Sequence, residues 1–179
     1  FCSIDVALIQ PRQTGKSVST DTLMDWLLYI GASNTKINMI TKDDTLRKAN
    51  VERLKKIRDY LPKYLVNITK RDSDNQFELT CKMYENTYTS GVSQNSETTA
   101  NNLGRGLTAP VTHIDEGPFI NYIGVTLPAA LASGTTAREE AERYGRPYGN
   151  IFTTTAGKKD DRDGRFMYDL IHGGIVWTE

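Results

Sequence analysis

Eight consecutive residues near the start of the sequence have the pattern of a phosphate-binding loop. They follow an apolar run, residues 4–9, and precede a stretch with helical periodicity, so we expect a strand, a tight turn and a helix in succession. Such a turn exposes backbone N–H groups to phosphate, and the helix start adds its partial positive charge. Gln10 stands where the pattern G-x-x-x-x-G-K-S/T has its first glycine. The predicted nucleotide-binding loop consists of Gln10, Pro11, Arg12, Gln13, Thr14, Gly15, Lys16 and Ser17.

Two loop residues and two acidic residues further along could carry the chemistry of ATP hydrolysis. Lys16 would reach the β- and γ-phosphates, and the Ser17 hydroxyl would bind Mg²⁺. Residues 111–114 form a predicted strand that ends directly in Asp115 and Glu116. Beside a phosphate loop, Asp115 would hold Mg²⁺ mainly through its water shell, and Glu116 would act as general base towards the attacking water. A strand that merely ends in a polar turn is the structural alternative, and the loop in the same chain argues against it.

Strand and helix patterns alternate along the sequence, which predicts a mainly parallel central sheet flanked by helices. Together with the loop, this pattern indicates an α/β fold of the P-loop NTPase type (RecA-like, ASCE). The polar, glycine-containing residues 93–110 are predicted to form a loop, and residues 77–83 and 86–92 to pair across a short turn. Further strands are expected at 37–41 and 150–155, and helices at 18–30, from 42–44 to Pro62, at 125–144 with a break near Ser133 and Gly134, and at 166–171.

The composition limits the class of protein and its partners. The 179 residues suffice for one domain with a sizeable core. Lysine plus arginine equal aspartate plus glutamate, 22 each, so the net charge of zero gives no global attraction to DNA or membrane. No apolar run approaches the length of a membrane span, and two cysteines without metal-like spacing favour a reducing compartment. His113 and His172 are interpreted as structural, because no third metal ligand has suitable spacing.

Positive charge is concentrated in residues 42–71. This segment has ten basic and four acidic side chains, a local charge of +6 (10 − 4). A solvated outer helix face produces such a pattern, and so does a surface that binds DNA or a protein partner. The segment is the best candidate in the sequence for a weak, salt-sensitive DNA contact, because tight binding would need more phosphate neutralisation than a neutral chain offers.

Three motifs in succession resemble the ATPase domain of the large terminase subunit of tailed bacteriophages, the motor that packages double-stranded DNA into proheads. That family tolerates a variant first loop position and carries arginine-glutamine inside the loop, as Arg12 and Gln13 do here. Its acidic motif is matched by residues 114–120, and its strand ending in threonines before a glycine-bearing loop is matched by residues 151–157. The predicted helix that ends in Leu-Pro, residues 54–62, is also similar. The resemblance covers nearly the whole chain.

The resemblance implies roles for residues beyond Lys16 and Ser17. Arg12 matches a loop arginine that senses or stabilises the γ-phosphate within the same subunit. Arg105 lies in a segment similar to the family's arginine-glycine segment and is a candidate finger for a neighbouring subunit's site. A coupling motif, which relays the hydrolysis state to the rest of the motor, is matched by Thr153, Thr154 and Thr155. Structural alternatives stay open: a surface arginine, a plain loop arginine and β-branched strand residues.

For the protein as a whole, the resemblance implies Mg²⁺-dependent ATP hydrolysis that moves double-stranded viral DNA into a prohead. Expected partners are the DNA, the portal protein and the small terminase subunit, with a homo-oligomeric ring on the prohead and a monomer as an isolated fragment. The expected location is the host cytoplasm at the prohead portal, neither secreted nor in a membrane. Residues 1–179 are expected to be one ATPase domain truncated at both ends, without the nuclease domain and without DNA cleavage. Two alternatives remain, a helicase-like translocase and a nucleotide-binding module without turnover.

Overall fold

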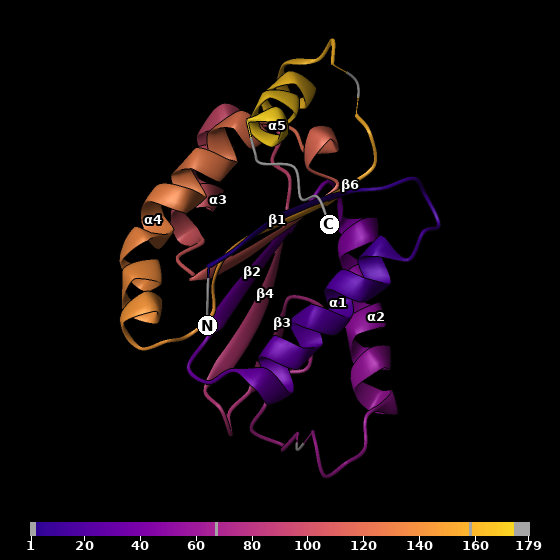
Figure 1. The fold of residues 1–179 in the computed structure, drawn as a ribbon, viewed down its shortest axis with the longest axis vertical. Coiled ribbons are helices and arrows are strands. Elements are labelled where there is room, and N and C mark those ends of the chain that lie inside the picture. The colour runs from indigo at the N-terminus through magenta and orange to yellow at the C-terminus, as the bar shows by residue number, and fades with distance from the viewer. Residues whose placement is uncertain (1–2, 67, 158, 174–179) are drawn as a thin grey trace.

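The computed structural model describes residues 3–66, 68–157 and 159–173, which form a twisted sheet covered by helices on both faces (Figure 1). The strand order is β1-β6-β5-β2-β4-β3, and only β3 runs antiparallel to its neighbour. This confirms the predicted mainly parallel sheet and the predicted pairing across the turn before residue 86. The strands are β1 Ser3–Ile9, β2 Lys36–Thr41, β3 Glu78–Cys81, β4 Asn86–Val92, β5 Val111–Asp115 and β6 Tyr148–Thr154.

The helices divide between the two faces of the sheet (Figure 1), α1 and α2 on one and α3, α4 and α5 on the other. Alternation along β2 serves both faces: Ile37 and Met39 pack in the core beneath α1 and α2, and Ile40 packs beneath α3 and α4. The helices are α1 Lys16–Trp26, which continues into the π-helical turn η1 Leu27–Gly31, α2 Asp44–Tyr60, α3 Glu97–Gly106, the short 3₁₀ turn η2 Gly117–Phe119, α4 Ile123–Arg143 and α5 Arg162–His172.

The predicted loop at residues 93–110 is wrong, because α3 occupies most of it. Ser96 caps this helix by accepting a hydrogen bond from the Thr99 N–H at 3.3 Å. Ala100 and Gly104 are the buried residues of α3, and Leu103 packs half-buried against the same core, so the apolar side of the helix is short and made mostly of small residues. Gly104 lets α3 approach α4 closely, since a Cβ there would lie 2.5 Å from a backbone carbonyl oxygen of α4.

The predicted break near Ser133 and Gly134 is also wrong, because α4 runs without interruption through both residues. The Ser133 hydroxyl donates to the carbonyl oxygens of Ala130 and Gly104, each at 3.1 Å. A Cβ on Gly134 would lie 3.0 Å from the Ala109 carbonyl oxygen. Ser133 therefore packs against α3 and Gly134 against the connection from α3 to β5, and neither residue ends the helix.

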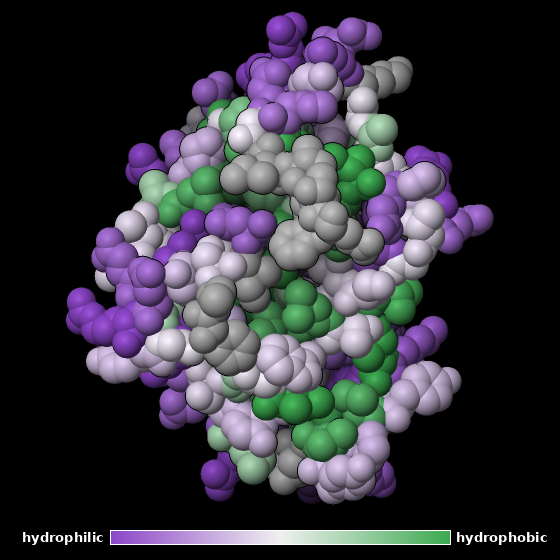
Figure 2. Space-filling model, in the orientation of Figure 1, coloured by the Kyte–Doolittle hydropathy of each residue, from purple (hydrophilic) through white to green (hydrophobic). Residues whose placement is uncertain are grey.

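Apolar side chains also reach the surface around the first strand and helix. Val6 and Ile9 of β1 are 42% and 48% exposed, and Val18 of α1 is 51% exposed. Figure 2 shows apolar atoms on the face turned to the viewer, over the side of the molecule where α1 lies.

Among the cysteines, Cys81 is buried and unpaired, and Cys2 lies outside the described residues.

Candidate active site

The predicted phosphate loop follows the C-terminal end of β1 and leads directly into α1. Gly15 adopts a left-handed backbone conformation (φ 87°) as the N-cap of α1, and Gln13 is also left-handed (φ 64°). Among the described residues, no side chain caps the first turn of α1. Its first N–H groups and partial positive charge are therefore available to an anion.

Gln10, which stands in place of the usual first glycine, contacts the loop through both its backbone and its side chain. Its backbone N–H donates to the Thr154 carbonyl oxygen at 3.2 Å, which extends the β1–β6 ladder by one residue. The Thr14 hydroxyl donates to the Pro11 carbonyl oxygen at 2.9 Å and lies 3.1 Å from Gln10 Oε1. The Gln10 side chain thus spans the base of the loop and holds its two ends together.

The acidic end of β5 lies against the start of α1. Lys16 is only 7% exposed, and its Nζ pairs with Glu116 Oε1 at 3.6 Å. Asp115 is 3% exposed, whereas the Glu116 side chain is 20% exposed. Glu116 adopts a left-handed conformation (φ 59°), which costs a non-glycine residue about 1 kcal/mol. Its N–H donates to the Thr153 carbonyl oxygen at 2.7 Å, which holds this conformation in place.

The threonines at the end of β6 contact both acidic residues. Thr153 Oγ1 donates to Asp115 Oδ1 at 2.8 Å, and Thr155 Oγ1 donates to Glu116 Oε2 at 3.2 Å. Thr154 is different, because its hydroxyl donates to the adjacent carbonyl oxygen of Thr155 at 2.7 Å. The phosphate loop, the acidic pair and the threonine run, which are far apart in the sequence, therefore meet at one edge of the sheet.

His113 is a buried sheet residue, as its sequence context suggested. Its Nε2 lies 2.9 Å from Thr153 Oγ1, and burial lowers the pKa of His113 to about 4. The ring is therefore neutral at pH 7. Because the Thr153 hydroxyl gives its own proton to Asp115, we assign the histidine proton to Nε2, which then donates to that hydroxyl.

The two candidate arginines are both exposed and lie at different edges of the sheet. Arg12 lies in the phosphate loop and makes no ion pair or hydrogen bond with another described residue. Arg105 lies in the last turn of α3, which leads into the N-terminal end of β5. Since the loop follows the C-terminal end of β1 and these strands are parallel to β6, Arg105 and the loop belong to opposite edges of the sheet.

Three polar side chains lead to Asp115 through successive contacts, and none of them belongs to a motif in the sequence. Asn50 of α2 donates from Nδ2 to Asp115 Oδ2 at 2.8 Å and accepts from Arg53 Nη2 at 2.6 Å. Arg53 also pairs through Nε with Asp21 of α1. The only sequence signal was an asparagine on the apolar stripe of α2, between positions occupied by leucines.

Most of the positive charge of residues 42–71 is used within the protein. Six of the ten basic residues form ion pairs, and two of the acidic partners, Asp21 and Asp74, lie outside the segment. The four basic residues without an ion pair in the described part of the chain are Lys56, Lys63, Lys70 and Arg71. Ion pairs within the protein therefore account for more of the basic residues in this segment than a DNA- or partner-binding surface would.

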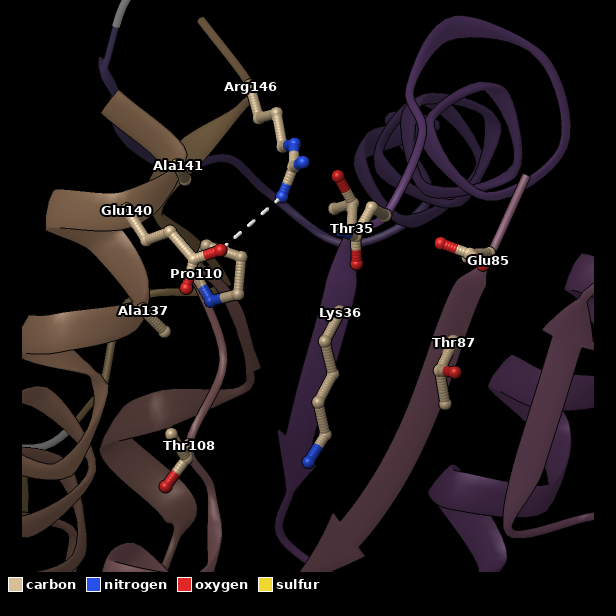
Figure 3. A pocket seen from close by; sticks show the side chains of 11 residues that line it. Thr35, Lys36, Glu85, Thr87, Thr108, Pro110, Ala137, Glu140, Ala141 and Arg146 are labelled. Atoms are coloured by element: carbon tan, nitrogen blue, oxygen red, sulfur yellow. Dashed lines mark ion pairs between the residues drawn. The ribbon is translucent and has the colours of Figure 1, made fainter. Parts of the chain in front are cut away.

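Figure 3 shows a pocket of about 320 Å³. It lies at the opposite edge of the sheet from the phosphate loop. Its lining includes Lys36 and Thr87 near the starts of β2 and β4, and Pro110 just before β5. Arg146 pairs with Glu140 at its rim at 3.8 Å. Because these are the N-terminal ends of parallel strands, the pocket is not part of the candidate active site.

A mainly parallel sheet, helices on both faces and a strand–phosphate loop–helix unit define the P-loop NTPase fold. The fold is that of solved phage large terminases, which confirms the predicted resemblance at the level of the fold. The large terminase of bacteriophage HK97 superposes with a TM-score of 0.56 at 17% identity, over 96% of this chain and 32% of that chain. The large terminase from a thermophilic bacteriophage gives a TM-score of 0.67 at 12% identity, over 94% and 38%.

This chain thus spans 32% and 38% of the lengths of the two terminases. No protein-family model matches the sequence, and no curated protein matches it either. In the described part of the chain, none of the helices combines the length and the apolar character that crossing a bilayer requires.

Proposed function

We propose that this chain is a Mg²⁺-dependent ATP hydrolase that drives the packaging of double-stranded viral DNA, as the ATPase domain of a large terminase subunit. The observation that carries the proposal is the meeting of the phosphate loop, Asp115-Glu116 and Thr153–Thr155 at one edge of the sheet. The fold shared with two phage large terminases supports the DNA-packaging assignment. Strand β6 lies between β1, which precedes the loop, and β5, which ends in the acidic pair. This spacing leaves room for the two carboxylates beside the loop.

In the proposed reaction, the phosphates of ATP lie against the loop amides and the first turn of α1. Lys16 turns from Glu116 to the β- and γ-phosphates, which releases the Glu116 carboxylate. Glu116 then accepts a proton from a water molecule as the water oxygen attacks the γ-phosphorus. The bond between the γ-phosphorus and the β–γ bridging oxygen breaks, giving ADP and inorganic phosphate. The ion pair places Lys16 next to the proposed base at 3.6 Å, which fits such an exchange of partners.

The residues at the loop fit a magnesium ion that accompanies the nucleotide. Ser17 offers a half-buried hydroxyl, and Asp115 offers a buried carboxylate. Each Asp115 oxygen accepts one hydrogen bond from the described residues, which leaves a lone pair on each for a metal-bound water. Bound Mg²⁺ would neutralise charge on the phosphates.

The arginines and threonines complete the proposed site. Arg12, exposed in the loop, would stabilise charge on the γ-phosphate of its own subunit. Arg105 would act in a neighbouring subunit's site within a ring, because it belongs to the far edge of its own sheet. Thr153 and Thr155, which hold the two acidic side chains, would transmit their changes during hydrolysis to β6.

DNA contact is proposed for the basic residues that have no ion pair in the described part of the chain. These four exposed residues of segment 42–71 would make few phosphate contacts in one subunit, so binding would be weak and salt-sensitive. A ring of subunits, held at the portal with the small terminase subunit as a further partner, would add the contacts of several copies.

The test is ATP turnover by the full-length protein assembled on proheads with DNA. Glu116→Gln should lower kcat by about 10²- to 10⁴-fold, the usual contribution of a general base, while nucleotide still binds. Lys16→Ala should weaken nucleotide binding and abolish turnover. Glu139→Gln, at an exposed glutamate of α4, is the matched control and should behave as wild type.

Wild-type turnover in Glu116→Gln or Lys16→Ala would overturn the assignment of these roles. Nucleotide binding by the wild-type protein without any turnover in the assembled motor would instead favour the nucleotide-binding module.

A further inference from the structure

Asp115 is held by side chains from two different layers of the fold. Asn50 of α2 donates to Oδ2, and Thr153 of β6 donates to Oδ1, each at 2.8 Å. Both donors are buried, Asn50 at 1% exposure and Thr153 at 0%. Two fixed donors on the two oxygens leave the carboxylate one orientation, because rotation about χ2 would break both hydrogen bonds.

Asn50 is itself fixed by Arg53, one helical turn further along α2. Arg53 Nη2 donates to Asn50 Oδ1 at 2.6 Å. Since an amide oxygen can only accept, this bond determines which end of the Asn50 amide points to Asp115. The guanidinium of Arg53 is anchored in turn by Asp21, which is 1% exposed on the loop-bearing helix α1. A continuous chain of hydrogen bonds therefore runs from α1 through α2 to the end of β5.

This arrangement is costly if its only task is to pack α1 against α2. Asn50 stands on the apolar stripe of α2, where Val51 and Leu54 enter the core beneath the sheet. An apolar side chain at such a position would avoid burying an amide and would not require Arg53 as a partner. The polar set instead supplies a hydrogen-bond donor to Asp115, a carboxylate that needs a fixed orientation to hold a metal-bound water.

We infer that Asn50, Arg53 and Asp21 form a positioning brace that orients Asp115 towards the magnesium ion of bound nucleotide. This inference rests on the proposed function, since it assigns a task to residues behind the same site. The brace acts through Asp115, so Asn50 and its two partners are positioning residues and touch neither nucleotide nor reacting atoms. It also links the helix that carries the phosphate loop to the strand that carries the acidic pair.

The test measures how nucleotide binding depends on Mg²⁺ in the full-length protein, with a fluorescent, slowly hydrolysed ATP analogue. Asn50→Leu should raise the Mg²⁺ concentration at half-maximal binding about tenfold, the usual cost of losing a hydrogen bond to a metal-holding side chain. Nucleotide affinity in EDTA should stay unchanged, because the loop amides and Lys16 are intact. Asn50→Ser, whose hydroxyl is too short to reach Asp115, should give the same shift with less disturbance of packing.

The matched control is Asn38→Leu. Asn38 is 0% exposed on β2, on the other face of the sheet, and its side-chain oxygen accepts a hydrogen bond from Thr89. The substitution should change thermal stability but leave the Mg²⁺ dependence alone. An unchanged Mg²⁺ midpoint in folded Asn50→Ser, or an equal shift in Asn38→Leu, would overturn the brace. A wild-type protein that binds no nucleotide with or without Mg²⁺ would instead overturn the proposed function, so the two failures are distinguishable.

Discussion

Replacing Asp25 with asparagine should flatten the pH dependence of the free energy of unfolding. Asp25 lies on α1 at 1% exposure, and both of its carboxylate oxygens lack a hydrogen-bond partner in the described part of the chain. Its pKa is raised to about 8, first by burial and then by the neighbouring Asp21, while Arg58 acts in the opposite direction and Asp59 adds a smaller rise.

The sign and size of the effect follow from proton linkage. Between the ordinary aspartate pKa, 3.8, and the folded value, about 8, the folded protein keeps a proton on Asp25 that the unfolded chain releases. Stability that is fully present at low pH is therefore lost as the pH rises towards 8, by about 1.4 kcal/mol per pH unit. From pH 6 to pH 8 the loss from this one carboxyl is about 2 kcal/mol, because the slope diminishes near the folded pKa.

Urea unfolding of wild type and Asp25→Asn at several pH values between 5 and 9 measures this loss of stability. The mutant should be more stable than wild type at pH 8 and above, with the advantage shrinking at lower pH. Asp21, whose pKa burial raises to about 7, contributes a slope of the same sign in both proteins. Asp169→Asn, at an exposed aspartate of α5, is the control and should leave the pH profile as it is. Parallel stability curves for wild type and Asp25→Asn would refute the reasoning.

Two further substitutions, each with a matched control variant, test one packing contact and one polar contact. Gly104→Ala should lower the free energy of unfolding by about 1–3 kcal/mol, because its Cβ would lie 2.5 Å from a carbonyl oxygen of α4; Gly106→Ala, where a Cβ meets nothing within 4 Å, should be neutral in the same thermal unfolding assay. Thr153→Val should cost about 1–3 kcal/mol, because it removes a buried donor from Asp115. Thr154→Val, whose hydroxyl bonds only the adjacent carbonyl, should cost less, and equal losses would contradict the assigned network.

Local sequence patterns predicted those parts of the site that are formed by residues close together in the sequence. The phosphate loop and the acidic strand end each have a pattern complete within a few residues, and the alternation of strands with helices predicted the sheet that brings them together. Helix α3 was missed because its apolar side is short and made mostly of small residues, and because Gly104 packs against α4 through a close backbone contact. Such a contact depends on a partner that is distant in sequence.

Asn50 shows a second limit of sequence patterns. Its spacing on α2 predicted a position facing the core, and it does face the core. The partner that makes an amide acceptable there, Asp115, is 65 residues away. Gln10 is similar, since its side chain makes a contact across the loop with Thr14 that the loop pattern does not include.

The hydrogen-bond chain behind Asp115 also restricts how related sequences can vary. Residue 50 must donate to a carboxylate and accept from a guanidinium at once, which few side chains can do. Loss of Arg53 leaves Asp21 as a buried carboxylate without its cation, so the two should be lost or exchanged together. Homologues are therefore expected to show correlated substitutions at positions 21, 50 and 53, with position 115 invariant wherever all three are kept.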